Sequence, residues 1–385
     1  MCVEPKILKI MRQKVWIGSL LALGLFACGG PKGYVIQGEV TGFPDSTEVY
    51  LLNGQSNEKM DSARIIGGKF QMQGVLAEEP ISVRLTIQTK PVVGTSLLMG
   101  NERITLQGDK DDFPNGVNRT LSKYDIQDEH FHAVTRSLLR EHDSLVKILI
   151  KMPAEMQRGQ DGATLLRRIR RLSRQHDSLQ RDYMFAHPDT YPSLIKLSYD
   201  MFSYSRDTVQ MLFDQMSPEL QASSYAKRVR LFLNTQPVAV GDPFLDFEAE
   251  DQNGNRVRLS DFVGKDGKYV LLDFTRAGCG PCIQANKELR QMVDTYSDSL
   301  QIVSFSIDHH KEGWLNSLKR DSICWPSLWS AEDVDRGIIT VPYEIRSTPR
   351  FFVIDPQGKV IQKWRGYGKG TFDKQIGRLK NRSSK

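Results

Sequence analysis

Two cysteines separated by two residues, Cys279 and Cys282, stand between an apolar run and an amphipathic segment. The run at 269–274 contains a single charged residue, Asp273. Apolar residues follow the pair at helical spacing, at Ala285, Leu289, Met292, Val293 and Tyr296. The pattern predicts a strand, a tight connection that carries the pair, and a helix that buries this apolar side. A cysteine pair at such a junction favours a thiol–disulfide exchange site.

The region around the pair alternates between strand-like and helix-like segments. We expect strands at 269–274 and 302–307, helices at 280–296 and 311–320, then a hairpin of 351–354 and 360–364 and a closing helix at 372–379. Alternating strands and helices imply a sheet with a parallel portion and right-handed crossovers.

The first 27 residues predict a secretory signal. Basic residues, the last of them Lys14, precede an apolar run of 13 residues from Val15 to Ala27, which is shorter than the roughly 18 residues that a permanent membrane helix needs. The run ends at Ala27-Cys28 and resembles the lipobox of bacterial lipoproteins, which implies that Cys28 is the lipidation site. An ordinary cleaved signal followed by a chance cysteine is the alternative.

This resemblance implies a protein of the cell envelope that is tethered by lipid. The residues after Cys28 are Gly29 and Gly30, so the aspartate that retains some lipoproteins at the inner membrane is absent. We therefore expect the periplasmic side of the outer membrane.

The remaining cysteines follow from simple counting. Of five cysteines, Cys2 leaves with the signal and Cys28 is acylated, so only Cys324 remains beside the central pair. No structural disulfide framework is expected. We predict that Cys324 is a buried small hydrophobic residue, and a third redox thiol is the alternative.

The charge pattern gives little support to nucleic-acid binding, although the formal net charge is +6. The dense basic cluster consists of Arg167, Arg168, Arg170, Arg171 and Arg174. Leucine and isoleucine recur among these arginines at helical spacing, so a solvated helix face is the expected structure.

Two further regions precede the cysteine pair. Residues 33–115 contain short β-runs at 34–40, 48–52, 69–73, 82–87 and 103–106, separated by turn residues, which predicts a β-sandwich without a catalytic constellation. A spacer or docking role is the simplest interpretation. Residues 120–235 change to helical periodicity. Within them His142 and His176 lack partners at ligand spacing, so we expect polar helix residues and no metal site.

Residues 238–385, which follow a linker at 236–243, resemble the thioredoxin-fold domain of TlpA/ResA-like thiol–disulfide oxidoreductases. Four motifs in family order carry the resemblance: Val270–Phe274, Cys279–Cys282, Ser306–Asp308 with Trp314, and Ser347–Pro349. The expected fold class is a multidomain α+β protein with an N-terminal β-sandwich, a central helical region and a C-terminal thioredoxin-like α/β fold.

The resemblance also implies catalytic roles. Cys279 at a helix N-terminus is the expected nucleophile, because unsatisfied N–H groups and a partial positive charge there favour its thiolate. Cys282 resolves the mixed disulfide. Asp273 is expected to be buried with a raised pKa, which suits a general base for Cys282. An aspartate that only caps the strand end is the alternative.

The resemblance places substrate next to Thr348 and Pro349, whose peptide bond is expected to be cis. Gly278 departs from the family pattern, since an aromatic residue usually precedes the first cysteine. We expect Gly278 to take part in substrate contact at a lip that is less apolar than usual.

Together these features predict an exported, tethered oxidoreductase that reduces protein disulfides without a cofactor or metal. The expected partners are disulfide-bearing exported proteins and a membrane electron donor, and not nucleic acid. A peroxiredoxin-like peroxide reductase is one alternative, although Thr275 lies four residues before Cys279 without the proline of that motif. A non-enzymatic surface binding lipoprotein is the other.

Overall fold

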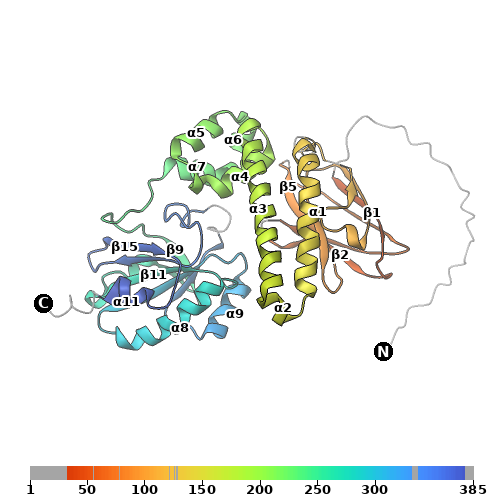
Figure 1. Cartoon of the computed structure of the whole chain (residues 1–385). Coiled ribbons are helices and arrows are strands. Elements are labelled where there is room, and N and C mark those ends of the chain that lie inside the picture. Colours follow the sequence, from red (N-terminus) through yellow and green to blue (C-terminus); the bar gives the residue numbers. More distant parts are fainter. Residues whose placement is uncertain are drawn as a thin grey trace, which may run out of the picture.

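The computed structural model describes residues 33–377, apart from positions 55, 78, 121, 125, 127, 128 and 332–336, and it describes 129–134 by backbone alone. Figure 1 shows a β-rich part, a helical part and an α/β part that follow one another along the chain. The predicted signal at 1–27, Cys28 and the end of the predicted closing helix lie outside the described residues. Within the described residues, no helix is long and apolar enough to cross a membrane.

The N-terminal part is a sandwich of two four-stranded sheets. One sheet has the order β4 (Lys69–Gly74), β1 (Tyr34–Thr41), β7 (Arg103–Asp109) and β8 (Asn118–Arg119). The other has the order β3 (Lys59–Arg64), β2 (Glu48–Asn53), β5 (Ile81–Ile87) and β6 (Val93–Met99). Ile36 and Ile104 from the first sheet pack with Val49 and Val83 from the second in one buried cluster. The predicted β-sandwich is confirmed.

The two long strands that sequence reasoning missed, β3 and β6, lie at the edges of their sheet. The strand β3 reads Lys-Met-Asp-Ser-Ala-Arg and has no apolar alternation, which is acceptable at an edge where one side faces water. The strand β6 contains Gly94, where a Cβ atom would lie 2.3 Å from the carbonyl oxygen of Leu85. Glycine there permits the close approach of the two backbones.

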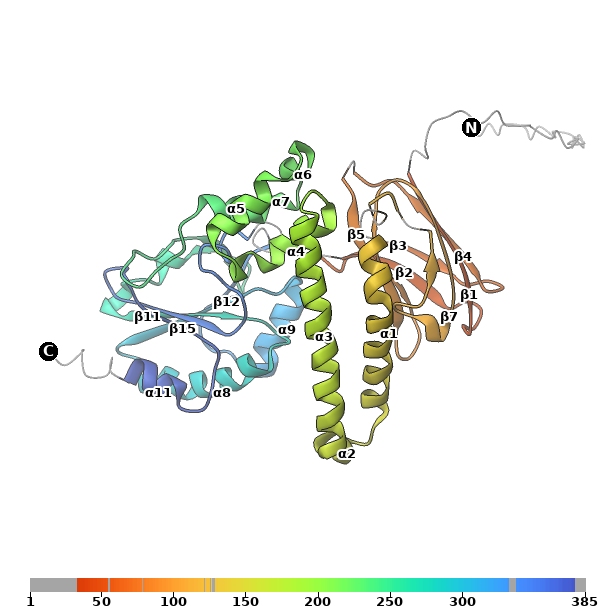
Figure 2. The same cartoon turned by 45° about the horizontal axis from the view of Figure 1, so that its top comes forward.

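The helical part begins with an antiparallel hairpin, α1 (Glu129–Lys151) and α3 (Gln160–Ala186), joined by α2 (Ala154–Arg158). Four shorter helices follow: α4 (Tyr191–Asp200), α5 (Arg206–Asp214), α6 (Pro218–Ala222) and α7 (Ala226–Asn234). In Figures 1 and 2 the hairpin stands between the sandwich and the α/β part. The five clustered arginines lie exposed on α3, which confirms the solvated face. No metal-binding group of three or more acidic, histidine or cysteine residues occurs in the described part of the chain.

The three parts are in direct contact. The Tyr225 hydroxyl accepts a hydrogen bond from the Ser82 N–H of β5 at 3.0 Å. Leu98 of the sandwich and Val341 of the α/β part both belong to the buried cluster of the helical part. The Arg346 guanidinium lies 5.7 Å from the ring centroid of Phe202, a cation–π geometry.

The C-terminal part is a seven-stranded sheet flanked by helices. Its strand order is β10 (Arg256–Arg258), β9 (Glu248–Asp251), β13 (Ser327–Trp329), β12 (Leu300–Ser306), β11 (Tyr269–Thr275), β14 (Arg350–Ile354) and β15 (Val360–Arg365). Its helices are α8 (Gly280–Thr295), α9 (Lys311–Asp321) and α11 (Thr371–Ile376). Parallel pairing joins β11 to β12 and β12 to β13, whereas the other pairs are antiparallel. This is a thioredoxin-like fold, as predicted.

The central strand β11 is buried on both faces, and its alternation decides which side chains meet α8. Leu271 packs in the cluster that contains Ala285 and Leu289 of α8. Val270, Leu272 and Phe274 pack in the cluster on the opposite face. Because side chains alternate along a strand, Asp273 points to the same face as Leu271, beneath the helix that carries Cys282.

One sequence prediction is wrong at this level: Cys324 is exposed and free, not buried. It stands between Ile323, which packs partly against the α8-side cluster, and Trp325, which is 3% exposed within that cluster. The two larger apolar neighbours take the inward positions of this extended stretch, so the thiol points to solvent.

Candidate active site

The two central cysteines form a disulfide across the first turn of α8, with their Cα atoms 5.2 Å apart. Cys279 is the N-cap residue of the helix, and its Sγ accepts a hydrogen bond from the Cys282 N–H at 3.1 Å. Pro281 occupies the first turn, where a missing N–H has no cost. Cys279 is 8% exposed whereas Cys282 is 1% exposed, so an incoming sulfur reaches Cys279 first.

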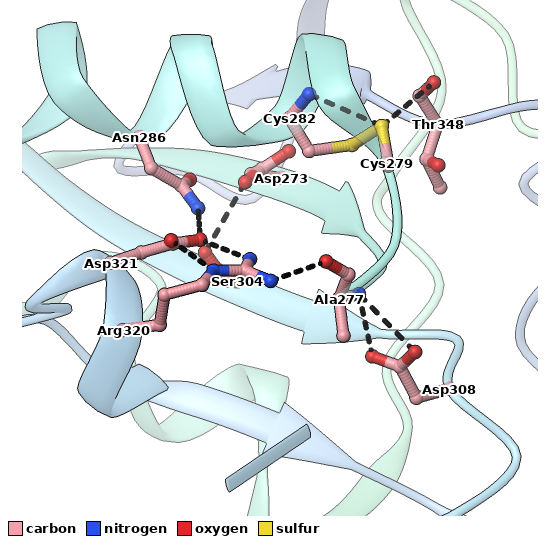
Figure 3. Close-up of a disulfide and its surroundings, with 10 residues drawn as sticks. All are labelled: Asp273, Ala277, Cys279, Cys282, Asn286, Ser304, Asp308, Arg320, Asp321 and Thr348. Carbon is pink, nitrogen blue, oxygen red and sulfur yellow. Dashed lines mark hydrogen bonds and ion pairs between the residues drawn. A yellow bond between two sulfur atoms is a disulfide. The ribbon is translucent and has the colours of Figure 1, made fainter. Parts of the chain in front are cut away.

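Asp273 lies on the sheet side of the disulfide (Figure 3) and is fully buried. Its Oδ2 accepts a hydrogen bond from Ser304 at 3.3 Å, and its Oδ1 has no hydrogen-bond partner. Burial raises the pKa of Asp273 to about 7, and the bond from Ser304 opposes that rise only partly. A carboxyl with such a pKa can accept and return a proton near neutral pH.

Ser304 fixes the position of that carboxyl from the neighbouring strand. It stands directly opposite Asp273 in the parallel pair of β11 and β12. Its hydroxyl in turn accepts a bond from the Trp325 indole N–H at 2.7 Å. The side chain that bonds to Asp273 is therefore held by a second buried group.

The outer edge of the site is formed by the loop before β14. The Thr348–Pro349 peptide bond is cis, as the resemblance implied. The carbonyl oxygen of Thr348 lies 3.5 Å from Cys279 Sγ (Figure 3). Gly278 is exposed, and a Cβ atom at this position would meet nothing within 4 Å. The space in front of the pair is therefore open at Gly278.

Comparison with known proteins bears on what this arrangement does. A model of the AhpC/TSA family matches residues 240–363, and a model of a domain of unknown function, DUF4369, matches 34–135. The thiol-disulfide oxidoreductase ResA of Bacillus subtilis is 30% identical over 136 residues, which are 34% of this chain and 70% of that protein. The chain belongs to the ResA-like thiol–disulfide oxidoreductases.

Two further comparisons show the extent of the similarity. ResA of Geobacillus kaustophilus is 26% identical over 144 residues, which are 37% of this chain and 79% of that protein. The crystal structure of the thioredoxin domain of a Bacteroides vulgatus thiol-disulfide oxidoreductase has 28% sequence identity and a TM-score of 0.32, and covers 38% of this chain and 96% of that domain.

The ResA-like fold brings the predicted site residues together from three segments. Asp273 comes from β11, Cys279 and Cys282 from the start of α8, and Thr348 with Pro349 from the loop before β14. Gly278 adjoins the pair at the open side. Their assigned roles stay predictions, as does the lipidation of Cys28, which lies outside the described residues.

Sequence reasoning missed a group of polar residues beside this ResA-like site. Asn286, one turn after Cys282, is 5% exposed and bonds to Asp321 at the end of α9. Arg320 bonds to the carbonyl oxygen of Ala277 in the loop before the pair. The available signal was Asn286, a polar residue on the otherwise apolar buried side of the helix.

Proposed function

We propose that this protein is an exported, membrane-tethered reductase of protein disulfides that acts through Cys279 and Cys282. The observation that carries the proposal is a cysteine pair at the start of α8 with a buried carboxyl of raised pKa on its inner side. Export and tethering are supported by the predicted signal and the lipobox-like sequence that ends at Cys28.

The reaction begins with the reduced pair. The Cys279 thiolate attacks one sulfur of a substrate disulfide, and the bond between the substrate sulfurs breaks as a mixed disulfide forms. The departing substrate sulfur leaves as a thiolate and takes a proton. The N-terminus of α8 favours the attacking thiolate, because the N–H of Cys282 points at Cys279 Sγ.

The second step releases the substrate. Cys282 gives its proton to the carboxylate form of Asp273 and attacks Cys279 Sγ, which forms the intramolecular disulfide and expels the second substrate thiolate. Two electrons have then passed from the pair to the substrate. A membrane dithiol donor must return two electrons before the next turnover. The Gly-Pro sequence between the cysteines resembles reducing members of the family, which supports this direction.

The test is a trapping experiment in cells with the full chain. We expect Cys282→Ser to accumulate mixed disulfides with exported proteins, because Cys279 can attack but nothing resolves the product. The exposed Cys324 can form adducts of its own, so every variant carries Cys324→Ser as well.

The matched control is Cys279→Ser, which leaves only the buried cysteine of the pair. Equal adducts in both variants, or none in the Cys282→Ser variant, would contradict a reductase that attacks through Cys279. Peroxide consumption that requires Cys279 but not Cys282 would instead support the peroxide-reductase alternative.

A further inference from the structure

The short loop between β11 and the cysteine pair is held by two charged residues that are distant in sequence. The Ala277 N–H donates to both carboxylate oxygens of Asp308, at 2.9 and 3.2 Å. The Ala277 carbonyl accepts from Arg320 Nη1 at 2.9 Å. Figure 3 shows both contacts on the strand side of Cys279. The backbone N–H and carbonyl of Ala277, two residues before Cys279, are therefore both held by hydrogen bonds.

Arg320 is itself fixed by Asp321. Its Nε and Nη2 donate to the two carboxylate oxygens of Asp321 at 2.7 and 2.8 Å, a bidentate pair. The Asp321 side chain is only 6% exposed. Burial raises the pKa of Asp321, but the bonds from Arg320 and Asn286 outweigh burial and lower it overall. Asp321 is therefore an anion at neutral pH.

The same carboxylate also holds α8. The Asn286 side chain donates to Asp321 Oδ2 at 3.0 Å. Asn286 lies four residues after Cys282 and therefore one turn along the same helix. One buried anion is tied to the Cys279 side of the pair through Arg320 and Ala277, and to the Cys282 side through Asn286 (Figure 3).

We propose that Asp321, Arg320 and Asn286 are positioning residues that hold the loop before Cys279 against the helix turn after Cys282 and thereby favour the disulfide over the dithiol. The inference rests on the proposed function to the extent that the pair is taken as the redox centre. We call these three residues the Asp321 clamp.

The clamp acts through geometry more than through charge. Asp321 neutralises the Arg320 guanidinium at hydrogen-bond distance, so the net field of the pair at Cys279 is small. Holding two thiols close raises the effective concentration of each at the other. Loosening one segment therefore shifts the equilibrium toward the dithiol.

The experiment measures the equilibrium of the pair with glutathione in the full chain that carries Cys324→Ser. In this reaction the two thiols lose two electrons and two protons, and one glutathione disulfide becomes two glutathione thiols. We expect Arg320→Met to lower the equilibrium constant for disulfide formation by three- to tenfold, where tenfold corresponds to about 30 mV. Arg320→Lys, which keeps one donor, should restore part of the loss.

The matched control is Lys319→Met, which removes a neighbouring exposed cation from the same turn of α9. Asn286→Ala should produce a loss similar to that of Arg320→Met. Because both substitutions act through Asp321, the equilibrium constant of the double variant should decrease by less than the product of the two single fold-decreases. Far-ultraviolet circular dichroism checks that each variant is folded.

Either of two results would overturn the clamp. The first is that Arg320→Met and Lys319→Met have the same equilibrium constant for disulfide formation. The second is that the fold-decrease of the double variant equals the product of the fold-decreases of Arg320→Met and Asn286→Ala. The glutathione equilibrium needs no protein substrate. A Cys282→Ser variant that traps no partner, or a wild-type protein that fails to reduce protein disulfides, would therefore reject the proposed function and leave the clamp measurement intact.

Discussion

Asp273 combines a buried carboxyl with only one hydrogen bond. Ser304 satisfies Oδ2, while Oδ1 faces the interior without a partner. Moving a carboxylate out of water without full hydrogen bonding is costly, so the protonated form is favoured in the fold. The pKa of Asp273 rises to about 7 for this reason, and the folded protein then depends on pH through this residue.

We predict that Asp273 makes the oxidised protein lose stability between pH 5 and pH 8. In this range the unfolded chain has already released the Asp273 proton, whereas the folded chain releases it only near pH 7. The folded state binds more protons at Asp273, so the contribution of this residue to stability is greatest at low pH and is lost as the pH rises through about 7. The loss should be about 3 kcal/mol.

Urea unfolding followed by tryptophan fluorescence measures this loss, because every tryptophan except Trp16 lies in the thioredoxin-like part. Asp273→Asn should remove that share of the pH dependence, and Asp266→Asn, at an exposed carboxyl, should retain it. An equal slope with pH in the wild type and Asp273→Asn would show that the carboxyl is already ionised at pH 5.

At the scale of elements, the end of α9 contributes two of the three clamp residues and a strained turn. Ser322 ends the helix in the left-handed conformation with φ 52°, and its N–H bonds to the carbonyl oxygens of Leu318 and Lys319. Only glycine adopts this conformation without a Cβ clash. The Ser322 side chain is exposed.

We predict that Ser322→Gly raises the free energy of unfolding by about 0.5–1 kcal/mol, because glycine removes the steric cost at this helix end. Urea unfolding of the oxidised protein at pH 7 measures the change. Ser322→Ala keeps the Cβ atom and should give no gain. A loss of stability in Ser322→Gly would mean that the serine side chain contributes more than the turn costs.

The sequence pattern was sufficient to predict those elements in which apolar residues recur at every inward position. The strand β11 and the buried side of α8 follow from Val270 to Phe274 and from Ala285, Leu289, Met292 and Tyr296, all of which are buried. The cysteine pair and Asp273 could be predicted as a site because they interrupt these runs. The strand β3 could not be predicted, since an edge strand needs little apolar surface.

The Arg320 and Asp321 part of the clamp could not be predicted, for a different reason. Arg320 and Asp321 are ordinary charged residues of the last helical turn, where a basic residue is common. Arg320 contacts Ala277 through the backbone carbonyl, and a sequence does not mark which carbonyl accepts a side-chain bond. The predicted burial of Cys324 was wrong for a similar reason, because Ile323 and Trp325 occupy the inward positions on either side of it.

At the scale of the whole molecule, the helical part contacts both of the others. Tyr225 is 8% exposed and accepts the Ser82 N–H, and the Ser224 N–H donates to the Glu79 carboxylate at 3.0 and 3.1 Å. These bonds join the residues just before α7 to the start of β5 and to Glu79, which precedes it. The sandwich is therefore held against the helices by backbone donors as well as by apolar packing.

We predict that Tyr225→Phe destabilises the protein by about 1–3 kcal/mol, because the Ser82 N–H loses its acceptor in a partly buried interface. Differential scanning calorimetry of the full chain should show a lower midpoint. Tyr199→Phe is the matched control, since Tyr199 is 64% exposed and should change nothing. Unchanged midpoints for both variants would mean that water replaces the tyrosine hydroxyl.

The contacts of Val341 and Arg346 with the helical part affect how the thioredoxin-like part behaves when it is separated from the chain. Val341 is 3% exposed within the helical cluster, and Arg346 lies over Phe202. Both precede the cis-proline loop by only a few residues. Cutting the chain at 236–243 would expose Val341 to water and remove the contact of Arg346 with the Phe202 ring, so the cis-proline loop of a fragment would be less firmly supported than that of the intact protein.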